Sequence, residues 1–169
     1  MRQRARVAGA ALLWIALATG CSSIPKAAAM QARDVSVERS HPWRVGVRAS
    51  GGQDFEFRIS DAAFEQALRD SLVASGVFQG LVALDSGDYR LDVVLGDGVG
   101  VEGRELTVLW SLSRVADRTT VWQEPVTSRG RSHHFVGGVR GRRSLEYAAR
   151  ENIRLGIQAL SRIELPPAP

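Results

Sequence analysis

The chain has a single cysteine, Cys21, so no disulfide can form within it. A folded domain made by this chain must therefore be stabilised by a hydrophobic core, without a covalent cross-link. The 169 residues are enough for one such domain, and the sequence contains no internal repeat. We expect one compact unit whose strands and helices can be located from their apolar periodicity.

The N-terminus has the pattern of an export signal. Three arginines precede an uncharged apolar stretch over 7–18, which is shorter than the roughly 20 residues that cross a bilayer core. Small residues then lead to Cys21, and this arrangement resembles a bacterial lipoprotein signal peptide with its lipobox. The resemblance implies removal of residues 1–20 and acylation of Cys21. The alternative is an ordinary secretory signal, which would leave a free thiol in an oxidising compartment.

The residue after the cysteine indicates which membrane would hold the protein. Ser22 stands there rather than Asp. By the sorting rule of Gram-negative lipoproteins, the resemblance implies an anchor in the outer membrane, facing the periplasm. Stable anchoring needs more than one acyl chain, and bacterial lipoproteins carry three.

The charge of the exported part is close to zero. The chain has 22 basic and 18 acidic residues, a formal net charge of +4. Three arginines leave with the signal, so 22 − 3 = 19 basic residues face 18 acidic ones, a net charge of +1. A net charge this small does not favour binding to nucleic acid, and we predict no nucleic-acid partner.

Four segments follow from composition. We predict a signal peptide over 1–20, a lipidated tether over 21–40, a single domain over 41–165 and a short tail over 166–169. The tether prediction depends on a polar, Ala-rich sequence with few large apolar groups, which is typical of a spacer.

Alternation of apolar and polar residues with a period of two predicts the strands. The pattern covers 43–49 and 55–59, which a Gly51-Gly52 turn could join as a hairpin. It returns over 89–95 and 106–112, and the segment 119–126 is predicted as the hairpin partner of the latter.

Two helices are predicted. Ser60 or Asp61 can cap a helix over about 61–75, and Gly76 is a plausible C-terminal stop. The last helix is predicted to begin at Ser144 and to end before Pro166. The order ββαβββα predicts an α+β fold, a small antiparallel sheet with two helices packed on one face.

This pattern resembles a class of small Gram-negative envelope lipoproteins. The class includes the lipopolysaccharide-assembly lipoproteins and the auxiliary lipoproteins of lipid-transporting ABC systems. The segments that carry the resemblance are 61–78, 89–95, 106–126 and 144–163. The resemblance implies a non-catalytic accessory or adaptor role in outer-membrane assembly or lipid transport.

One basic segment is the candidate for partner binding. Between Glu124 and Glu146 the chain has no acid, and the segment has five arginines and two histidines. Arginine favours bidentate contact with phosphate or carboxylate, and apolar residues beside it add contact area. The candidate partner-binding residues are Arg129, Arg131, Phe135, Arg140, Arg142 and Arg143.

Several partners fit such a segment, and so does a purely structural role. An envelope protein complex, an anionic lipid or a glycan would each supply negative charge. The alternative is a solvated loop whose arginines brace nearby carbonyls and acids, such as Glu146. A different function class, a small-molecule or glycan binding module, would use a cleft between sheet and helices.

We predict no metal, no cofactor and no catalytic site. Adjacent His133 and His134 would point to opposite faces of a strand and would rarely ligate one ion. No nucleophile–base pair or carboxylate pair stands out. The tryptophans at 43, 110 and 122 are predicted in the core or on the sheet, although an exposed Trp122 would favour glycan binding.

Overall fold

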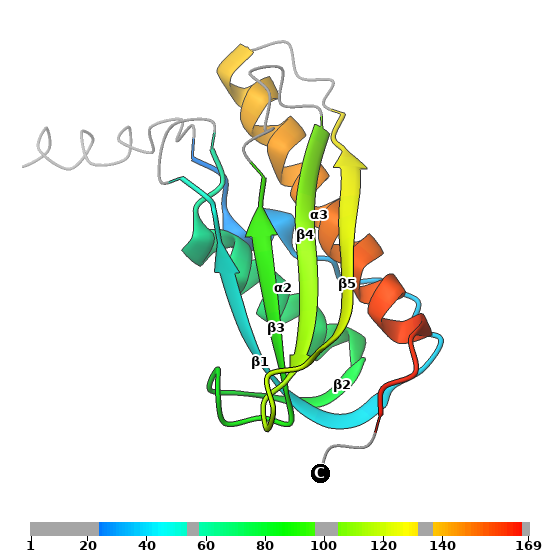
Figure 1. The fold of residues 1–169 in the computed structure, drawn as a ribbon. Coiled ribbons are helices and arrows are strands. Elements are labelled where there is room, and N and C mark those ends of the chain that lie inside the picture. The colour runs from blue at the N-terminus through cyan, green and yellow to red at the C-terminus, as the bar shows by residue number, and fades with distance from the viewer. Residues whose placement is uncertain (1–23, 54–57, 97–104, 132–136, 167–169) are drawn as a thin grey trace, which may run out of the picture.

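The computed structural model describes residues 24–53, 58–96, 105–131 and 137–166 (Figure 1). Within these ranges the order of elements is α1–β1–α2–β2–β3–β4–β5–α3. Their bounds are α1 Ala27–Met30, β1 His41–Ser50, α2 Asp61–Ser75, β2 Phe78–Val82, β3 Tyr89–Leu95, β4 Glu105–Arg114, β5 Thr120–Arg129 and α3 Gly137–Arg162. No helix in the described part of the chain has both the length and the apolar character that a membrane crossing needs.

The described strands form one five-stranded sheet in the order β2-β1-β3-β4-β5. The predicted α+β fold is confirmed, but the sheet is mixed rather than wholly antiparallel. β1 runs parallel to both β2 and β3, whereas β3, β4 and β5 form an antiparallel meander. The parallel pairs arise because α2 carries the chain back along the sheet between β1 and β2, a crossover that a short hairpin cannot make.

The predicted hairpin partner of β1 is not a strand where the structure describes it. Residues 54–57 lie outside the described residues, and residues 58–60 have no strand structure. The edge position beside β1 belongs instead to β2, which follows α2 directly. The short apolar run at Val77-Phe78 is the sequence signal for this strand.

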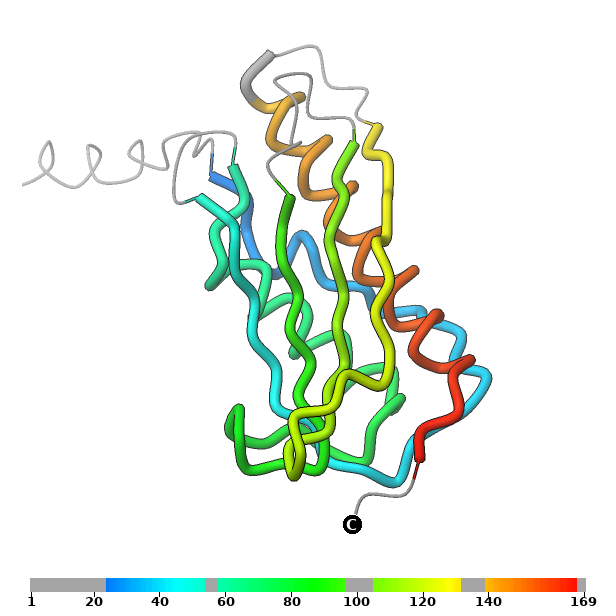
Figure 2. Tube along the Cα trace, in the orientation of Figure 1, coloured from blue at the N-terminus to red at the C-terminus, as the bar shows by residue number. Residues whose placement is uncertain are grey.

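The helices cover one face of the sheet and leave the other face open (Figures 1 and 2). Alternate strand residues point toward the helices and are buried, for example Val45, Val47 and Leu91. Trp110 of β4 lies at the centre of this core with no exposed surface. A Cβ added at Gly156 of α3 would stand only 2.3 Å from Trp110 Cζ2, so the helix backbone packs directly on the indole.

The first long helix matches its sequence signals. The Ser60 hydroxyl accepts a hydrogen bond from the Ala63 N–H at 3.3 Å, which caps the N-terminus of α2. Gly76 ends the helix in the left-handed conformation, with φ of 64°. The predicted helix over 61–75 is therefore confirmed.

The last helix begins earlier than predicted. α3 starts at Gly137, so Ser144 lies inside the helix and does not cap it. The Ser144 hydroxyl donates instead to the Gly130 carbonyl at 3.0 Å. A Cβ at Gly130 would lie 1.8 Å from the backbone carbonyl oxygen of Ser144, so the end of β5 and the helix are in direct contact. Glycine is required at position 130 for this approach.

The segment that precedes β1 packs on the domain. Met30 has no exposed surface and Ala32 is 4% exposed. The Ala32 N–H donates to Ser71 Oγ at 2.9 Å, and the Glu38 N–H donates to Ser161 Oγ at 3.2 Å. Figure 2 shows this segment, in blue to cyan, running along the helical side of the sheet to the start of β1.

Residues 24–40 of the predicted tether are therefore not a free spacer, and residues 21–23 lie outside the described residues. Residues 24–40 belong to the folded domain, because small and apolar side chains such as Met30 fill a seam beside α2 and α3. Composition alone suggested a spacer here, since the segment has few large apolar groups. The predicted signal peptide over 1–20 and Cys21 lie outside the described residues, as do residues 167–169 of the tail.

Candidate interaction surface

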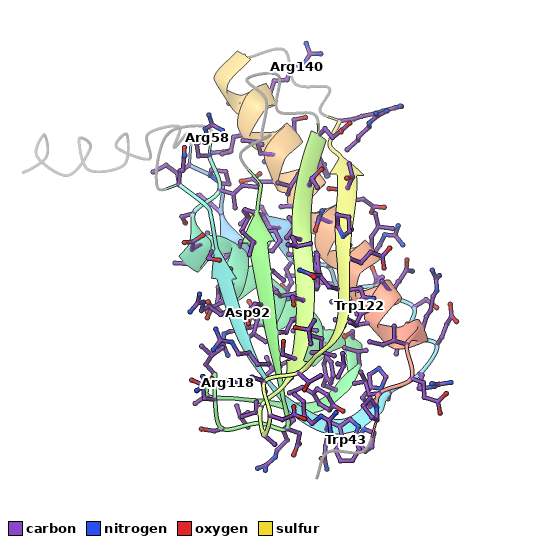
Figure 3. All side chains as sticks on the ribbon, in the orientation of Figure 1. Trp43, Arg58, Asp92, Arg118, Trp122 and Arg140 are labelled. Atoms are coloured by element: carbon purple, nitrogen blue, oxygen red, sulfur yellow. The ribbon has the colours of Figure 1, made fainter. Side chains whose placement is uncertain are left out.

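The predicted basic segment spans the end of β5 and the first turns of α3. Arg129, Arg131, Arg140 and Arg143 are exposed, and Arg142 is half-buried. Figure 3 places Arg140 at the end of the molecule where α3 begins. Phe135, His133 and His134 lie outside the described residues.

Two of these arginines hold acids of the same chain. Arg129 Nε lies 2.8 Å from Glu105 Oε2 across the β4–β5 pair. Arg142 Nε lies 3.6 Å from Glu146 Oε1, and the Glu146 side chain is only 5% exposed. These contacts match the structural alternative, in which arginines brace nearby acids.

Three arginines remain exposed to solvent. The side chains of Arg131, Arg140 and Arg143 form no hydrogen bond or ion pair with any other residue that the structure describes. An exposed guanidinium offers donors to an external phosphate or carboxylate. We name the surface of these three residues and the exposed Lys26 the basic end.

Glu146 connects the basic end to the N-terminal segment. Its Oε1 accepts a hydrogen bond from the Lys26 N–H at 3.2 Å, besides its contact with Arg142. The spacing of Glu146 and Arg150 suits an ion pair, but Arg150 Nε donates to the Ala29 carbonyl at 3.1 Å instead. Glu146 and Arg150 therefore fix α1 and its flanks to the first half of the last helix.

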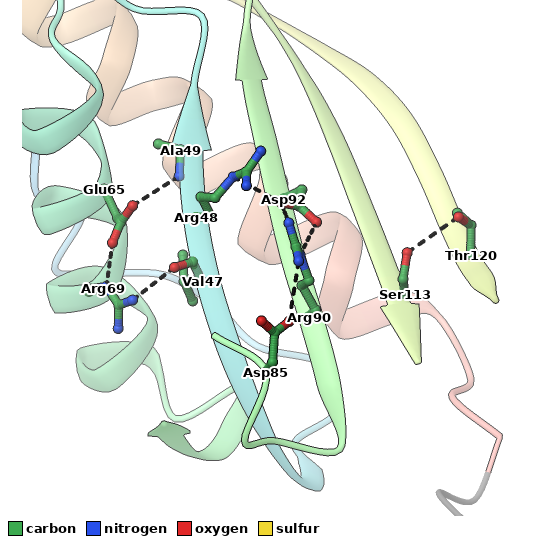
Figure 4. A network of polar contacts seen from close by, with 10 residues as sticks. All are labelled: Val47, Arg48, Ala49, Glu65, Arg69, Asp85, Arg90, Asp92, Ser113 and Thr120. Atoms are coloured by element: carbon green, nitrogen blue, oxygen red, sulfur yellow. Dashed lines mark hydrogen bonds and ion pairs between the residues drawn. The ribbon is translucent and has the colours of Figure 1, made fainter. Parts of the chain in front are cut away.

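The open face of the sheet carries a chain of ion pairs (Figure 4). Arg90 Nε lies 2.6 Å from Asp92 Oδ2, and Arg90 Nη1 lies 3.2 Å from Asp85 Oδ1. Arg48 adds a second contact to Asp92 at 3.6 Å. The hydrogen bond with Asp92 raises the pKa of Arg90, and this effect exceeds the opposing effect of partial burial.

A recess of about 520 Å³ lies beside these pairs. It is lined by Asp85, Arg90, Asp92, Ser113, Arg114, Val115 and Arg118. Its charges nearly balance, and only one lining residue is apolar. Small-molecule sites are usually lined mainly by apolar side chains around a few polar groups, so this recess does not have the composition of one.

The free edge of β1 is covered by side chains of α2 (Figure 4). β2 ends opposite Gly46, so the later residues of β1 have no strand partner on that side among the described residues. Glu65 Oε2 accepts from the Ala49 N–H at 3.1 Å, and Arg69 Nη2 donates to the Val47 carbonyl at 2.8 Å. The same two side chains pair with each other at 3.0 Å. This clamp occupies the donors and acceptors that another strand would need.

The tryptophans serve the core. Trp110 Nε1 donates to Asn152 Oδ1 at 3.0 Å in a fully buried contact. Trp43 and Trp122 are partly buried and pack on the core. Trp122 is thus not an exposed platform beside the basic end, and side chains fill the space between sheet and helices around Trp110. Neither observation favours a glycan site.

The histidine and acid positions give no sign of a metal site in the part of the chain that the structure describes. No group of three or more His, Cys, Asp or Glu residues there could hold an ion. His41 is buried, and its Nε2 lies 2.9 Å from the Leu160 carbonyl. This histidine therefore joins β1 to the end of α3.

These features define a class by fold: an α+β domain with a mixed sheet, helices on one face and an N-terminal segment packed on those helices. No family model and no curated protein matches the chain.

Solved structures share this fold. The protein XCC0632 from Xanthomonas campestris, of family DUF330, superposes with a TM-score of 0.58 at 9% identity, over 76% of this chain and 89% of that chain. A single-substitution variant of the PelC dodecamer from Paraburkholderia phytofirmans gives a TM-score of 0.51 at 18% identity, over 76% and 94% of the two chains. At these identities the likeness shows the fold alone.

Proposed function

We propose that this protein is a non-catalytic envelope lipoprotein, anchored through Cys21 in the outer membrane with its domain in the periplasm. It acts there as an accessory or adaptor protein in outer-membrane assembly or lipid transport. The lipobox-like sequence before Cys21 supports the anchor. The fold supports the class, since the expected α+β arrangement is present.

The observation that carries the adaptor role is the basic end. Arg131, Arg140 and Arg143 are exposed and have no partner among the described residues, whereas Arg129 and Arg142 are committed to acids of the domain. Exposed arginines gathered at one end provide donors for an anionic surface, be it an envelope protein, a lipid or a glycan.

The alternative, a small-molecule or glycan binding module, has less support. It requires a cleft with apolar walls, and the recess beside Arg90 is mainly polar and charged. The half-buried Trp122 also offers no stacking platform.

In-cell photo-crosslinking tests the adaptor role. A photoreactive residue is placed at 131 or at 140 in the lipidated protein, and a matched control is placed at 118, which is exposed at the opposite end of the sheet. A specific envelope-protein adduct from 131 and 140, absent from 118, supports an adaptor. Adducts with small molecules or glycans alone support the alternative. Identical adduct patterns at all three positions contradict a dedicated surface.

A further inference from the structure

The packed N-terminal segment limits how far the domain can stand from its anchor. Ile24 is the first described residue and follows Cys21 by three positions. Because a chain spans at most about 3.6 Å per residue, Ile24 lies within about 11 Å of Cys21 in any conformation. A spacer over 21–40 could have reached roughly 70 Å. The inference that follows rests on the proposed anchor at Cys21.

The short reach decides which part of the domain meets the lipid. The Lys26 N–H is bonded to Glu146, and Glu146 follows Arg140 by six residues on α3. Six residues of helix span about 9 Å, so Arg140 lies about that far along α3 from Glu146, the residue that holds the N-terminal segment. Figure 1 shows that β1, β3 and β5 end, and α3 begins, at this end of the molecule. Arg118 lies at the other end, in the β4–β5 turn (Figure 3).

The described charges at this end are mostly positive. Lys26, Arg131, Arg140 and Arg143 are exposed. Among the described acids there, Glu105 pairs with Arg129 and Glu146 with Arg142, whereas Asp61 accepts from the Gly52 N–H at 2.6 Å and keeps its negative charge. Further acids fall in 54–57 and 97–104, outside the described residues, so the test must measure their effect together with that of the arginines.

We propose that the basic end lies against the bilayer and that its arginines contact the phosphates of anionic lipid headgroups. At physiological salt, attraction between exposed charges extends about 8 Å. The short link to Cys21 allows the arginines to come this close to the headgroups. Ile24, which is 43% exposed, adds an apolar contact at the same end. The open sheet face then stands roughly upright from the membrane and remains accessible to proteins.

Headgroup quenching tests this orientation. Arg131→Cys and Arg118→Cys each remove one exposed arginine and add one reactive thiol, since Cys21 is acylated. Each lipidated variant is labelled with a fluorophore and reconstituted in phosphatidylcholine vesicles, with or without phosphatidylglycerol, that contain a lipid with a nitroxide on its headgroup. We expect strong quenching at 131 and little at 118.

The contribution of charge is tested by a second substitution. Arg140→Ser with Arg143→Ser, in the variant labelled at 131, should reduce quenching in phosphatidylglycerol vesicles. Each arginine near an anionic surface favours the membrane-facing orientation about fivefold. Removal of the pair therefore shifts the equilibrium between orientations about 25-fold. Arg39 Nη1 donates to the Ile163 carbonyl at 3.4 Å, just beyond the end of α3, and Arg118 lies in the β4–β5 turn. The matched control, Arg39→Ser with Arg118→Asn, therefore removes two arginines from the opposite end and should have no effect.

The outcomes separate the inference from the proposed function. Mass spectrometry that finds no acyl chain on Cys21 overturns both. A lipidated protein with equal quenching at 131 and 118 overturns the orientation alone. Stronger quenching at 131 that does not change with phosphatidylglycerol or with the double substitution overturns the headgroup contact.

Discussion

Asn152 links α3 to the sheet through one buried polar cluster. Its Oδ1 accepts from Trp110 Nε1 at 3.0 Å, and its Nδ2 donates to the carbonyls of Val126 at 2.7 Å and Leu106 at 3.3 Å. The side chain has no exposed surface. Replacing it therefore leaves buried groups that water cannot reach.

Asn152→Ala should lower the free energy of unfolding by about 2–4 kcal/mol. An unsatisfied buried donor costs about 1–3 kcal/mol, and the lost side chain adds a small cavity. The Leu106 carbonyl keeps a contact with Ser128 Oγ at 3.3 Å, so the indole N–H and the Val126 carbonyl are the groups most affected. For a domain of this size the midpoint of thermal unfolding should fall by roughly 6–12 °C.

A double-mutant cycle with Trp110→Phe identifies the cause. Phenylalanine removes the indole N–H, so Asn152→Ala in that background leaves no orphaned indole donor. We expect the two substitutions to be less than additive, with a coupling of about 1 kcal/mol or more in urea unfolding. Additive effects, or a cost for Asn152→Ala below about 0.5 kcal/mol, would refute the bridging role of the cluster.

Three further predictions follow from other contacts. Gly156→Ala should lower the free energy of unfolding by about 1 kcal/mol in urea denaturation, because the clash of its Cβ with the indole, 2.3 Å away, outweighs the gain in helix propensity; a stabilised variant contradicts this packing. Glu65→Ala with Arg69→Ala should expose the edge of β1 and increase self-association in size-exclusion chromatography, and an unchanged elution profile counts against the clamp. The hydrogen bond from Arg154 lowers the pKa of Glu151 below 4.5, so this carboxylate stabilises the fold above that pH. Glu151→Gln should therefore lower the unfolding midpoint at neutral pH, with the difference disappearing as the solution is acidified; a deficit that persists in acid would contradict it.

Local patterns predicted much of the fold. The cap at Ser60, the stop at Gly76 and the alternation in β3 and β4 are short-range signals, and each appears where expected. The parallel pairing of β1 could not be predicted in this way, because it depends on where α2 returns the chain.

The candidate site was partly predictable. The basic composition of the segment indicated Arg131, Arg140 and Arg143. It could not show which arginines of the segment pair with acids of the domain, because the fold decides that Glu105 meets Arg129 and Glu146 meets Arg142. The packing of residues 24–40 was missed because the partners of their backbone groups, Ser71 and Ser161, lie far away in sequence. No local pattern distinguishes such a segment from a spacer.

Hydrogen exchange of the vesicle-bound lipidated protein tests most directly whether the segment after the anchor is built into the domain. We expect the amides of Ala32 and Glu38, which are bonded to Ser71 and Ser161, to exchange far more slowly than in an unfolded chain. Ser71→Ala should then accelerate exchange at Ala32. Exchange across 27–40 at the rate of an unstructured peptide would show a free tether and would contradict both the packing and the membrane-facing basic end.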